Sequence, residues 1–465
     1  MAERDADVVV IGGGGAGLAA AVAAAEAGAS VLVLEQQPAP GGKTALAMGS
    51  ITAAETGPQR RHGVHDSLLA HREDLLRWLA RHGRAAAPDD PSVAVVLEDG
   101  AAVVGWLEQL GVTFSGPHPE RPHRAYRLHC AVPDGAAYIN CLARALAQQG
   151  GVLRCGAGAA GIALRDGGVE VALAGRPERL SAGAVVLAAG DYSGAVERFR
   201  PAARLEVEPL RAWARGDALQ LAQALGAALR GMDEPLVPSV RFSEPPYTEP
   251  DAQLYAAGAI LVDEQGQRRD QDGEPPAYTP AVCAARQLWM VFGGELVDRL
   301  ARPADDAPWA RDGWRRTGRL FICTAPGRGY DYLEDALARP GCAQAASPEA
   351  LARAVGIDPR GLAATLNALN RDRARQGRYL PIARPPFVAL GPLRARLLLT
   401  HGGIHVDTRL QVLRADGTPV PRVFAAGNAA YSVGWAGAHG YSLAWAFASG
   451  RRAGRHAAAA ALAAG

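Results

Sequence analysis

The stretch 7–35, DVVVIGGGGAGLAAAVAAAEAGASVLVLE, constrains the fold of this chain more than any other. Its apolar run 8–11 predicts a short buried strand, a run of small residues follows, and 18–27 predicts an Ala-rich helix. Gly28 is typical of a helix stop, and a second β-rich run ends on Glu35. Strand, glycine turn, helix, strand and acid form the pattern of a dinucleotide-binding βαβ unit.

The small residues of this turn have separate physical tasks. Gly12 permits the tight turn, Gly14 lets the backbone approach a pyrophosphate, and Gly17 lets the helix close on the strand. Free N–H groups at the helix N-terminus then face the phosphates, and the acid accepts from the hydroxyls of an adenosine ribose. We therefore expect this unit to bind the dinucleotide through Gly12, Gly14, Gly15, Ala16, Gly17 and Glu35.

Composition narrows the class of protein. A chain of 465 residues is long enough for two or three domains, and its net charge of +2, with acids and bases interspersed, predicts no nucleic-acid partner. The six cysteines show no metal spacing, and no signal peptide precedes the first strand. We expect reduced thiols, no metal site and a cytoplasmic protein. The nearly uncharged run 8–27 could also suggest a membrane span, but its central glycines and flanking acids argue against one.

Loops of small residues indicate which dinucleotide binds. A nicotinamide-binding domain would usually continue into another βα unit, whereas here a loop follows that can press its backbone against a flat ligand; a surface turn is the alternative. Small residues recur after the apolar runs 184–187 and 422–426, and no second GxGxxG unit is present. This favours FAD over a nicotinamide cofactor. The further residues expected to bind FAD are Gln36, Gly42, Lys43, Thr44, Gly49, Ser50, Ala159, Ala189, Gly190, Gly427, Asn428, Ser442 and Leu443.

Periodicity outlines the rest of the chain. Ser442 is expected to cap a C-terminal helix whose N-terminus suits the flavin N1–C2=O edge. Other expected elements are helices at 65–81, 91–110, 136–149, 216–229 and 347–377, a β-meander at 152–190, and strands at 254–262 and 287–292. We expect an α/β fold in which residues 1–210 and 355–465 form the FAD domain. Residues 211–354 are expected to form an inserted α+β cap domain.

Histidines and arginines gather around several prolines in the segment 117–129. They are His118, His123, Arg124, Arg127 and His129. A metal site is one interpretation, although no histidine pair has clean i, i+4 spacing with a third carboxylate. A solvated loop and a loop that contacts an anionic or carbonyl substrate are the others.

Five stretches together resemble the flavoprotein family of fumarate reductase, succinate dehydrogenase and 3-ketosteroid dehydrogenase. They are VVVIGGGGAGLAA, VLEQQPAPGGKT, VVLAAGDYSG, GGIHVDTRLQVL and VFAAGN. The resemblance implies a Rossmann-like FAD domain of the glutathione-reductase type, with FAD bound in an extended form. It also implies a cap domain that seals the substrate against the isoalloxazine.

The stretches that would decide the branch of this family depart from fumarate reductase. Segments 275–278, 398–401 and 437–440 lack the arginines that would clamp a dicarboxylate and donate a proton. In the ketosteroid-dehydrogenase branch, tyrosines and a glycine N–H act instead. Tyr278 falls near the position of the cap-domain base, and Gly440 matches the polarising glycine. A second polarising tyrosine is replaced by Trp435 or Ala436, and His439 is added, so this loop departs from the pattern of the steroid enzymes.

Desaturation of a C–C bond beside a carbonyl needs a base for the α-proton, a hydride acceptor and donors for the developing enolate. Tyr278 is the expected base, helped by a neighbour such as Tyr126, and the Gly440 N–H is the expected donor, with His439 or Trp435. Tyr278 could instead be a packed or surface aromatic, with rival tyrosines at Tyr126, Tyr247, Tyr255, Tyr431 and Tyr441.

We therefore expect an FAD-dependent dehydrogenase of a small carbonyl compound that passes electrons to a quinone-like acceptor or O2. The alternatives are an enone or enoate reductase on the same scaffold, and a flavin-binding subunit without turnover of its own.

Overall fold

The computed structural model divides the chain into two compact units. Unit 1 comprises residues 1–203, 211–236 and 399–465, and unit 2 comprises 204–210 and 237–398. The residues that the structure describes are 4–81, 85–86, 90–118, 123–201, 207–234, 236–243, 249–250, 254–255, 258–270, 280–301, 321–325, 329–377, 379–433 and 440–463.

A parallel sheet forms the centre of unit 1, in the strand order β21-β22-β9-β1-β2-β6. Its strands are β1 (Ala6–Ile11), β2 (Val31–Glu35), β6 (Val152–Cys155), β9 (Arg179–Leu187), β21 (Gln411–Leu413) and β22 (Pro419–Ala425). All neighbours run parallel except β21 and β22. The antiparallel strands β7 (Ala159–Arg165) and β8 (Gly168–Leu173) continue from β9. Residues 8–10 are fully buried, which explains why residues 8–11 of β1 form an unbroken apolar run rather than an alternating one.

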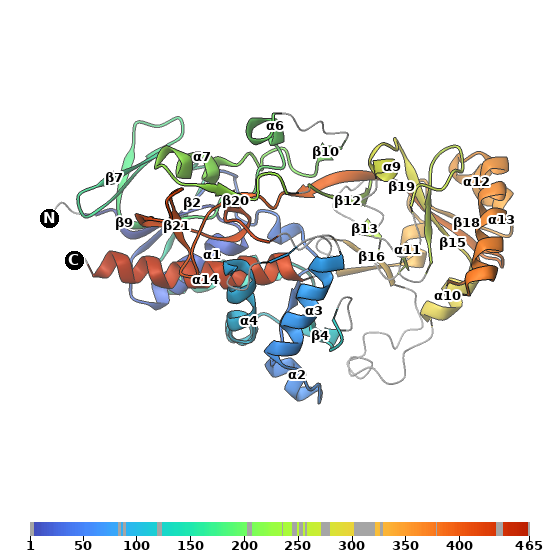
Figure 1. Cartoon of the computed structure of the whole chain (residues 1–465), viewed down its shortest axis with the longest axis horizontal. Helices are drawn as coiled ribbons and strands as arrows, with labels where there is room; N and C mark the ends of the chain where they lie inside the picture. The colour runs from blue at the N-terminus through green and yellow to red at the C-terminus, as the bar shows by residue number, and fades with distance from the viewer. Residues whose placement is uncertain are drawn as a thin grey trace. The chain divides into compact units, whose positions relative to one another are not determined.

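Two helices distant in the sequence lie side by side in unit 1, α1 (Gly15–Glu26) and α14 (Tyr441–Leu462) (Figure 1). A Cβ added at Gly450 would lie 2.3 Å from the carbonyl oxygen of Ala16, and one added at Gly454 would lie 2.1 Å from that of Ala20. The helices can approach this closely only because α14 has glycine at both points. The same close packing explains why α1 consists almost entirely of small residues.

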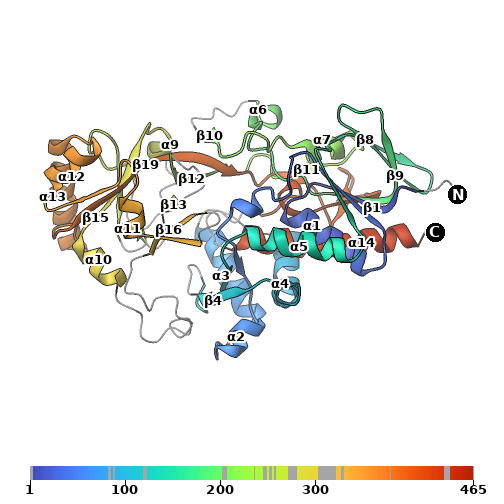
Figure 2. The same ribbon diagram turned by 180° about the vertical axis from the view of Figure 1, so that it is seen from behind.

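The remaining elements of unit 1 surround this core. Helix α5 (Ala136–Gln148) packs against α1, as Figure 2 shows from behind, and α4 (Pro91–Gln109) packs against α14. A small antiparallel sheet joins β3 (Ser50–Thr52), β5 (Leu128–Ala131) and β4 (Phe114–His118). The other elements are η1 (Thr44–Leu46), α2 (Gly57–Arg61), α3 (Leu68–Arg81), α6 (Val196–Phe199), α7 (Asp217–Ala224), β11 (Leu229–Arg230), β20 (Gly403–Ile404) and η4 (Gly427–Ala429).

Unit 2 is built on a mixed sheet with the path β10-β19-β15-β14. The strands are β10 (Glu208–Pro209), β12 (Val237–Phe242), β14 (Ile260–Val262), β15 (Leu288–Phe292), β18 (Ala343–Ala345) and β19 (Phe387–Leu399), with a separate sheet of β13 (Glu249–Pro250), β16 (Phe321–Ala325) and β17 (Gly329–Tyr332). The helices are α9 (Pro280–Cys283), α10 (Gly294–Ala301), α11 (Leu333–Leu337), α12 (Pro348–Val355) and α13 (Pro359–Gln376).

Both faces of this sheet are apolar. On β15, Met290 and Phe292 pack into one core, while Trp289 and Val291 pack into the other, which contains side chains of α12 and α13. The alternation follows from the period of two residues in a strand.

The division into units differs from the expected cap of 211–354 at both ends. Residues 211–236 lie in unit 1, where Leu229 of β11 pairs with Ile404 of β20. Residues 355–398 lie in unit 2, because β19 pairs with β15 and β18. The expected helix 347–377 is two helices, interrupted where Gly356 adopts a φ of +83°.

Among the described residues, no helix is both long enough and apolar enough to cross a bilayer.

Candidate functional site

The ends of four strands meet on one rung of the unit 1 sheet. Ile11 of β1 pairs with Leu34 of β2 and with Leu187 of β9, and Leu187 also pairs with Ala425 of β22. Ligands of open α/β sheets bind outside the carboxyl ends of the parallel strands. The register therefore brings to one edge the small-residue signals that lie far apart in the sequence: Gly12 to Gly17, Glu35, Ala188 to Gly190, and Ala426 to Asn428.

The glycine turn has room for a ligand at one position only. A Cβ at Gly12, whose φ is +112°, would lie 2.5 Å from the carbonyl oxygen of Ala188, and one at Gly17 would lie 1.8 Å from that of Gly12. The fold itself therefore requires both glycines. Gly14 has an ordinary φ of −79°, and a Cβ there would meet nothing closer than 3.9 Å. The space beside this half-buried residue fits a close approach of a pyrophosphate.

Glu35 ends β2 beside this turn. One carboxylate oxygen accepts from the N–H of Gly13 at 2.7 Å, and the other accepts from the N–H of Gln37 at 2.7 Å. Since a carboxylate offers about four lone-pair sites, Glu35 keeps the capacity to accept from ribose hydroxyls. These residues therefore fit the adenosine and pyrophosphate part of FAD.

Lys43 and Thr44 join the loop after β2 to its surroundings. The hydroxyl of Thr44 accepts from the N–H of Gly15 at 3.2 Å. The ammonium of Lys43 donates to both carboxylate oxygens of Asp191, at 2.9 and 2.7 Å, and to the hydroxyl of Ser193 at 2.8 Å. Burial lowers the pKa of Lys43, and Asp191 opposes that shift. The side chain thus ties this loop to the loop after β9; its contact with FAD stays a prediction.

The other predicted FAD-binding residues of the strand ends and loops are also in unit 1. The carbonyl of Gly49 accepts from the Tyr138 hydroxyl at 2.6 Å. Gly190 has a φ of +80°, and a Cβ added there would meet nothing within 4 Å; the N–H of Gly427 donates to Ser449 Oγ at 2.9 Å. Gly42, Ser50, Ala159, Ala189 and Asn428 are half-buried, and Gln36 is exposed. Their contacts with FAD remain predictions.

Helix α14 begins one residue before the expected cap. Gly440 is its N-cap, with a φ of +83° and no side-chain cap, so Ser442 lies in the first turn and the prediction of a serine cap is wrong. Only glycine adopts this conformation readily. The first helical bond runs from the N–H of Ala444 to the carbonyl of Gly440 at 3.0 Å. The N–H groups of Ser442 and Leu443 therefore have no acceptor within the helix.

Gly440 is pressed against β3. The N–H of Thr52 donates to the carbonyl of Gly440 at 3.3 Å. A Cβ at Gly440 would lie 2.7 Å from the nitrogen of Thr52 and 2.8 Å from a methyl of Leu128. This position has no room for a side chain.

A buried polar cluster adjoins Gly440. Arg127, which is 0% exposed, donates to both oxygens of Asp66 at 2.6 Å and to Asp74 at 2.6 Å. His123 lies between Arg127 and Thr52, with its Nδ1 3.2 Å from the guanidinium and its Nε2 3.2 Å from the threonine hydroxyl. Arg127 and His129 are buried and so are not part of a solvated loop, whereas Arg124 is exposed.

Neighbouring histidines complete the cluster. His71 Nε2 lies 2.9 Å from the Tyr441 hydroxyl, and His129 Nε2 lies 2.8 Å from the Thr56 hydroxyl. Burial lowers the pKa of His71 well below its usual value, lowers that of His129 to about 4, and raises that of Tyr441 well above its usual value. All three groups are therefore neutral near pH 7.

Sequence reasoning missed part of this cluster. It did not single out Asp66, His71 or Asp74, and it named Tyr441 only as a rival base. The helical spacing of His71 and Asp74, three residues apart on one face of α3, is the signal that could have indicated them.

The catalytic candidates are only partly described. Tyr278, Trp435, Ala436 and His439 lie outside the described residues. Tyr126 is half-buried, and its backbone carbonyl accepts from Gln59 at 2.9 Å. Among the described residues, no group of His, Cys, Asp or Glu side chains is arranged to hold a metal ion.

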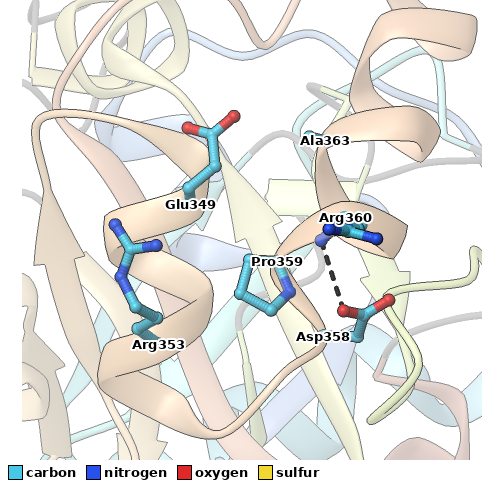
Figure 3. Close-up of a pocket in the computed structure, with 6 residues that line it drawn as sticks. All are labelled: Glu349, Arg353, Asp358, Pro359, Arg360 and Ala363. Atoms are coloured by element: carbon cyan, nitrogen blue, oxygen red, sulfur yellow. Dashed lines mark hydrogen bonds between the residues drawn. The ribbon is translucent and has the colours of Figure 1, made fainter.

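Unit 2 has an open hollow of about 410 Å³ between α12 and α13 (Figure 3). Its lining consists of Glu349, Arg353, Asp358, Pro359, Arg360 and Ala363. Asp358 caps α13 by accepting from the N–H groups of Arg360 and Gly361. This carboxylate has a structural task, and we assign the hollow no role in binding FAD.

Comparison with known proteins identifies the class. Residues 7–442 match the family described as FAD binding domain. Because that match covers most of the chain, the protein belongs to this family, and the prediction of FAD as cofactor is confirmed, as is the predicted α/β fold class.

Curated proteins also match the chain. It is 25% identical over 430 residues to "Probable fumarate reductase Ifc3" of Shewanella frigidimarina, a match that covers 85% of this chain and 65% of that protein. The chain thus spans less than two thirds of the length of this relative.

Solved structures share the fold. The open conformation of a flavocytochrome c3 fumarate reductase superimposes with a TM-score of 0.74 at 23% identity, covering 98% of this chain and 78% of that one. The 3-ketosteroid-Δ4-(5α)-dehydrogenase of Rhodococcus jostii RHA1 superimposes with a TM-score of 0.66 at 24% identity, covering 98% of both chains. The predicted resemblance to the family of these flavoproteins is confirmed.

Proposed function

We propose that this protein is an FAD-dependent oxidoreductase that desaturates a C–C bond next to the carbonyl of a cyclic ketone or related small molecule. A base removes the α-proton, and bound FAD supplies the acceptor for the β-hydride at its N5. A quinone-like compound or O2 then takes the electrons.

The observation that carries this proposal is the place of Gly440 at the N-terminus of α14. The first-turn N–H groups of α14 lack acceptors in the helix, and the positive end of the helix dipole favours negative charge beside them. Donors held at the point where an enolate oxygen develops lower the barrier to removal of the α-proton. We assign the Gly440 N–H to the substrate carbonyl, with His439 or Trp435 as a second donor.

In the part of the chain that the structure describes, the charges near Gly440 favour a neutral substrate. Arg127 is the buried cation of the adjoining cluster, and its guanidinium is engaged by the carboxylates of Asp66 and Asp74. His71 and His129 are neutral. A dicarboxylate would need a cation to balance it, whereas a ketone needs hydrogen-bond donors alone.

Tyr278 is our candidate for the base. Its phenol has to titrate below the usual value of roughly 10 to work near neutral pH. Replacing Tyr278 with Phe removes the base while keeping the ring.

The test is anaerobic bleaching of the flavin. We expect cyclic ketones to bleach the yellow enzyme, and Tyr278→Phe to slow bleaching by roughly 100-fold or more. Tyr379→Phe is a matched control, because Tyr379 belongs to the same unit and its ring packs under Arg373, with the guanidinium carbon 5.5 Å from the ring centroid. Bleaching of Tyr278→Phe at the normal rate would exclude Tyr278 as the base.

The alternative direction has its own support. The relative named a probable fumarate reductase favours an enone or enoate reductase on the same scaffold. Adding enones or fumarate to the dithionite-reduced protein measures this reaction by the return of the yellow colour. A protein that binds FAD but reacts in neither direction would be a flavin-binding subunit.

A further inference from the structure

The polar cluster beside Gly440 contains a continuous chain of hydrogen bonds that the proposed reaction does not use. It runs from Asp66 and Asp74 through Arg127 and His123 to Thr52, and we call these residues the Arg127 network. Its contacts span 2.6–3.2 Å. Arg127 and Thr52 are both 0% exposed. Burying the charge of Arg127 costs free energy of folding even with these partners. Stabilising its own loop is therefore a poor explanation for the network.

Hydrogen-bond donors and acceptors determine where the protons of this network lie. A guanidinium only donates and keeps its proton in proteins, so Nδ1 of His123 accepts from Arg127. A histidine that accepts at Nδ1 is neutral and carries its hydrogen on Nε2. Nε2 of His123 therefore donates to the hydroxyl of Thr52. Because Arg127 cannot pass on a proton, the network orients groups and does not conduct protons.

The last residue of the network contacts Gly440 directly. The backbone N–H of Thr52 donates to the Gly440 carbonyl at 3.3 Å, and β3 is held in turn by the pairing of Thr52 with Leu128 of β5. At the residue that follows Gly440, the Tyr441 hydroxyl contacts His71, whose ring packs edge-on against that of His123, with centroids 5.4 Å apart. The network therefore holds Gly440 directly at its carbonyl and, through His71, at the next residue.

We propose that His123 and Thr52 are positioning residues that hold the Gly440 N–H in the direction that the substrate carbonyl requires. This inference rests on the proposed function of Gly440. A donor contributes fully only when it already points to the oxygen that gains charge. Small displacements of reacting groups can cost up to about 100-fold in rate.

Substitutions at His123 separate positioning from proton transfer. His123→Gln keeps an oxygen that can accept from Arg127 and an N–H that can donate to Thr52, whereas His123→Leu removes both. We expect His123→Leu and Thr52→Val each to slow the limiting rate of anaerobic bleaching by roughly 10- to 100-fold, with little change in the substrate concentration at half-saturation. His123→Gln should stay within about 3-fold of the wild type, with an unchanged pH profile.

Thr56→Val is the matched control. Thr56 is also 0% exposed and its hydroxyl also contacts a histidine, His129, but it caps α2 and does not contact Gly440. This variant should lose some stability and keep its bleaching rate.

Hydrogen exchange of the Thr52 amide provides a readout that needs neither substrate nor turnover. Exchange should be about 10-fold faster or more in His123→Leu, because the bond to the Gly440 carbonyl loosens, and unchanged in Thr56→Val. If no ketone bleaches the wild type while exchange responds as expected, the proposed function fails and the restraint on Gly440 stands. Normal exchange and normal bleaching in Thr52→Val would overturn the inference. The inference would also be overturned if His123→Gln and His123→Leu slowed bleaching equally. The reaction would then require a side chain that titrates, and not only one that forms the two hydrogen bonds.

Discussion

His129 should make the protein less stable in mild acid, and replacing it should remove that loss. Burial lowers the pKa of His129 from its usual 6.5 to about 4, so the folded protein keeps the ring neutral where the unfolded chain protonates it. Between these two values the unfolded state binds more protons, and stability therefore falls as the pH falls from 6.5 toward 4. The fall of this pKa from 6.5 to about 4 corresponds to about 3 kcal/mol of the free energy of unfolding, which is lost between neutral pH and pH 4.

The assay is urea unfolding of the wild type and His129→Gln at several pH values from 7.5 to 4.5. We expect the free energies of unfolding to converge as the pH falls, by roughly 2–3 kcal/mol in total. His65→Gln, at an exposed histidine, is the control and should follow the wild type. A difference between wild type and His129→Gln that does not change with pH would refute the reasoning, because it would mean that His129 titrates alike in both states.

Other predictions concern packing, the buried ion pair and the cofactor. Gly454→Ala should destabilise the protein although alanine favours helices, because its Cβ would lie 2.1 Å from a carbonyl oxygen. Gly105→Ala, on α4 where a Cβ meets nothing within 4 Å, should instead raise the free energy of unfolding by about 0.5–1 kcal/mol. Thermal unfolding compares the two variants. Lys43→Met should lower the free energy of unfolding by about 3–5 kcal/mol, because Asp191 stays buried without its cation. The double variant Lys43→Met/Asp191→Asn should recover part of that free energy. Gly14→Ala should leave the melting temperature nearly unchanged and weaken FAD binding about 10-fold or more, measured by reconstitution of the apoprotein, because the fold has room for this Cβ and the pyrophosphate does not. A large loss of stability in this variant would contradict that assignment.

The meeting of the small-residue strand ends at one edge of the unit 1 sheet could be predicted, because each of these signals is local. Gly12, Gly17 and Glu35 belong to one short pattern whose geometry follows from backbone sterics and strand pairing. The convergence of Gly190 and Gly427 on the same edge also followed from sequence, since parallel strands present their carboxyl ends together.

Long-range pairings could not be predicted in the same way. Two contacts join segments that are far apart in the sequence: the Lys43–Asp191 ion pair and the contact of His71 with Tyr441. The local pattern of one segment does not indicate the other. The start of α14 was misplaced because Ser442 is a good cap in isolation, whereas packing against β3 makes Gly440 the cap. The bounds of unit 2 differ from those of the expected cap because β19 pairs with strands from several parts of the chain, and such pairing leaves no periodic signal.

The packing of α14 on α1 has a consequence for biosynthesis. The glycine turn is made well before β22 and α14, which pair with its sheet and cover its helix. A nascent chain therefore carries an apolar, Ala-rich helix without its partner until α14 leaves the ribosome, a state that favours chaperone binding or aggregation. Incorporation of FAD should consequently follow the synthesis and docking of α14, and fragments that stop before Tyr441 should not retain the cofactor.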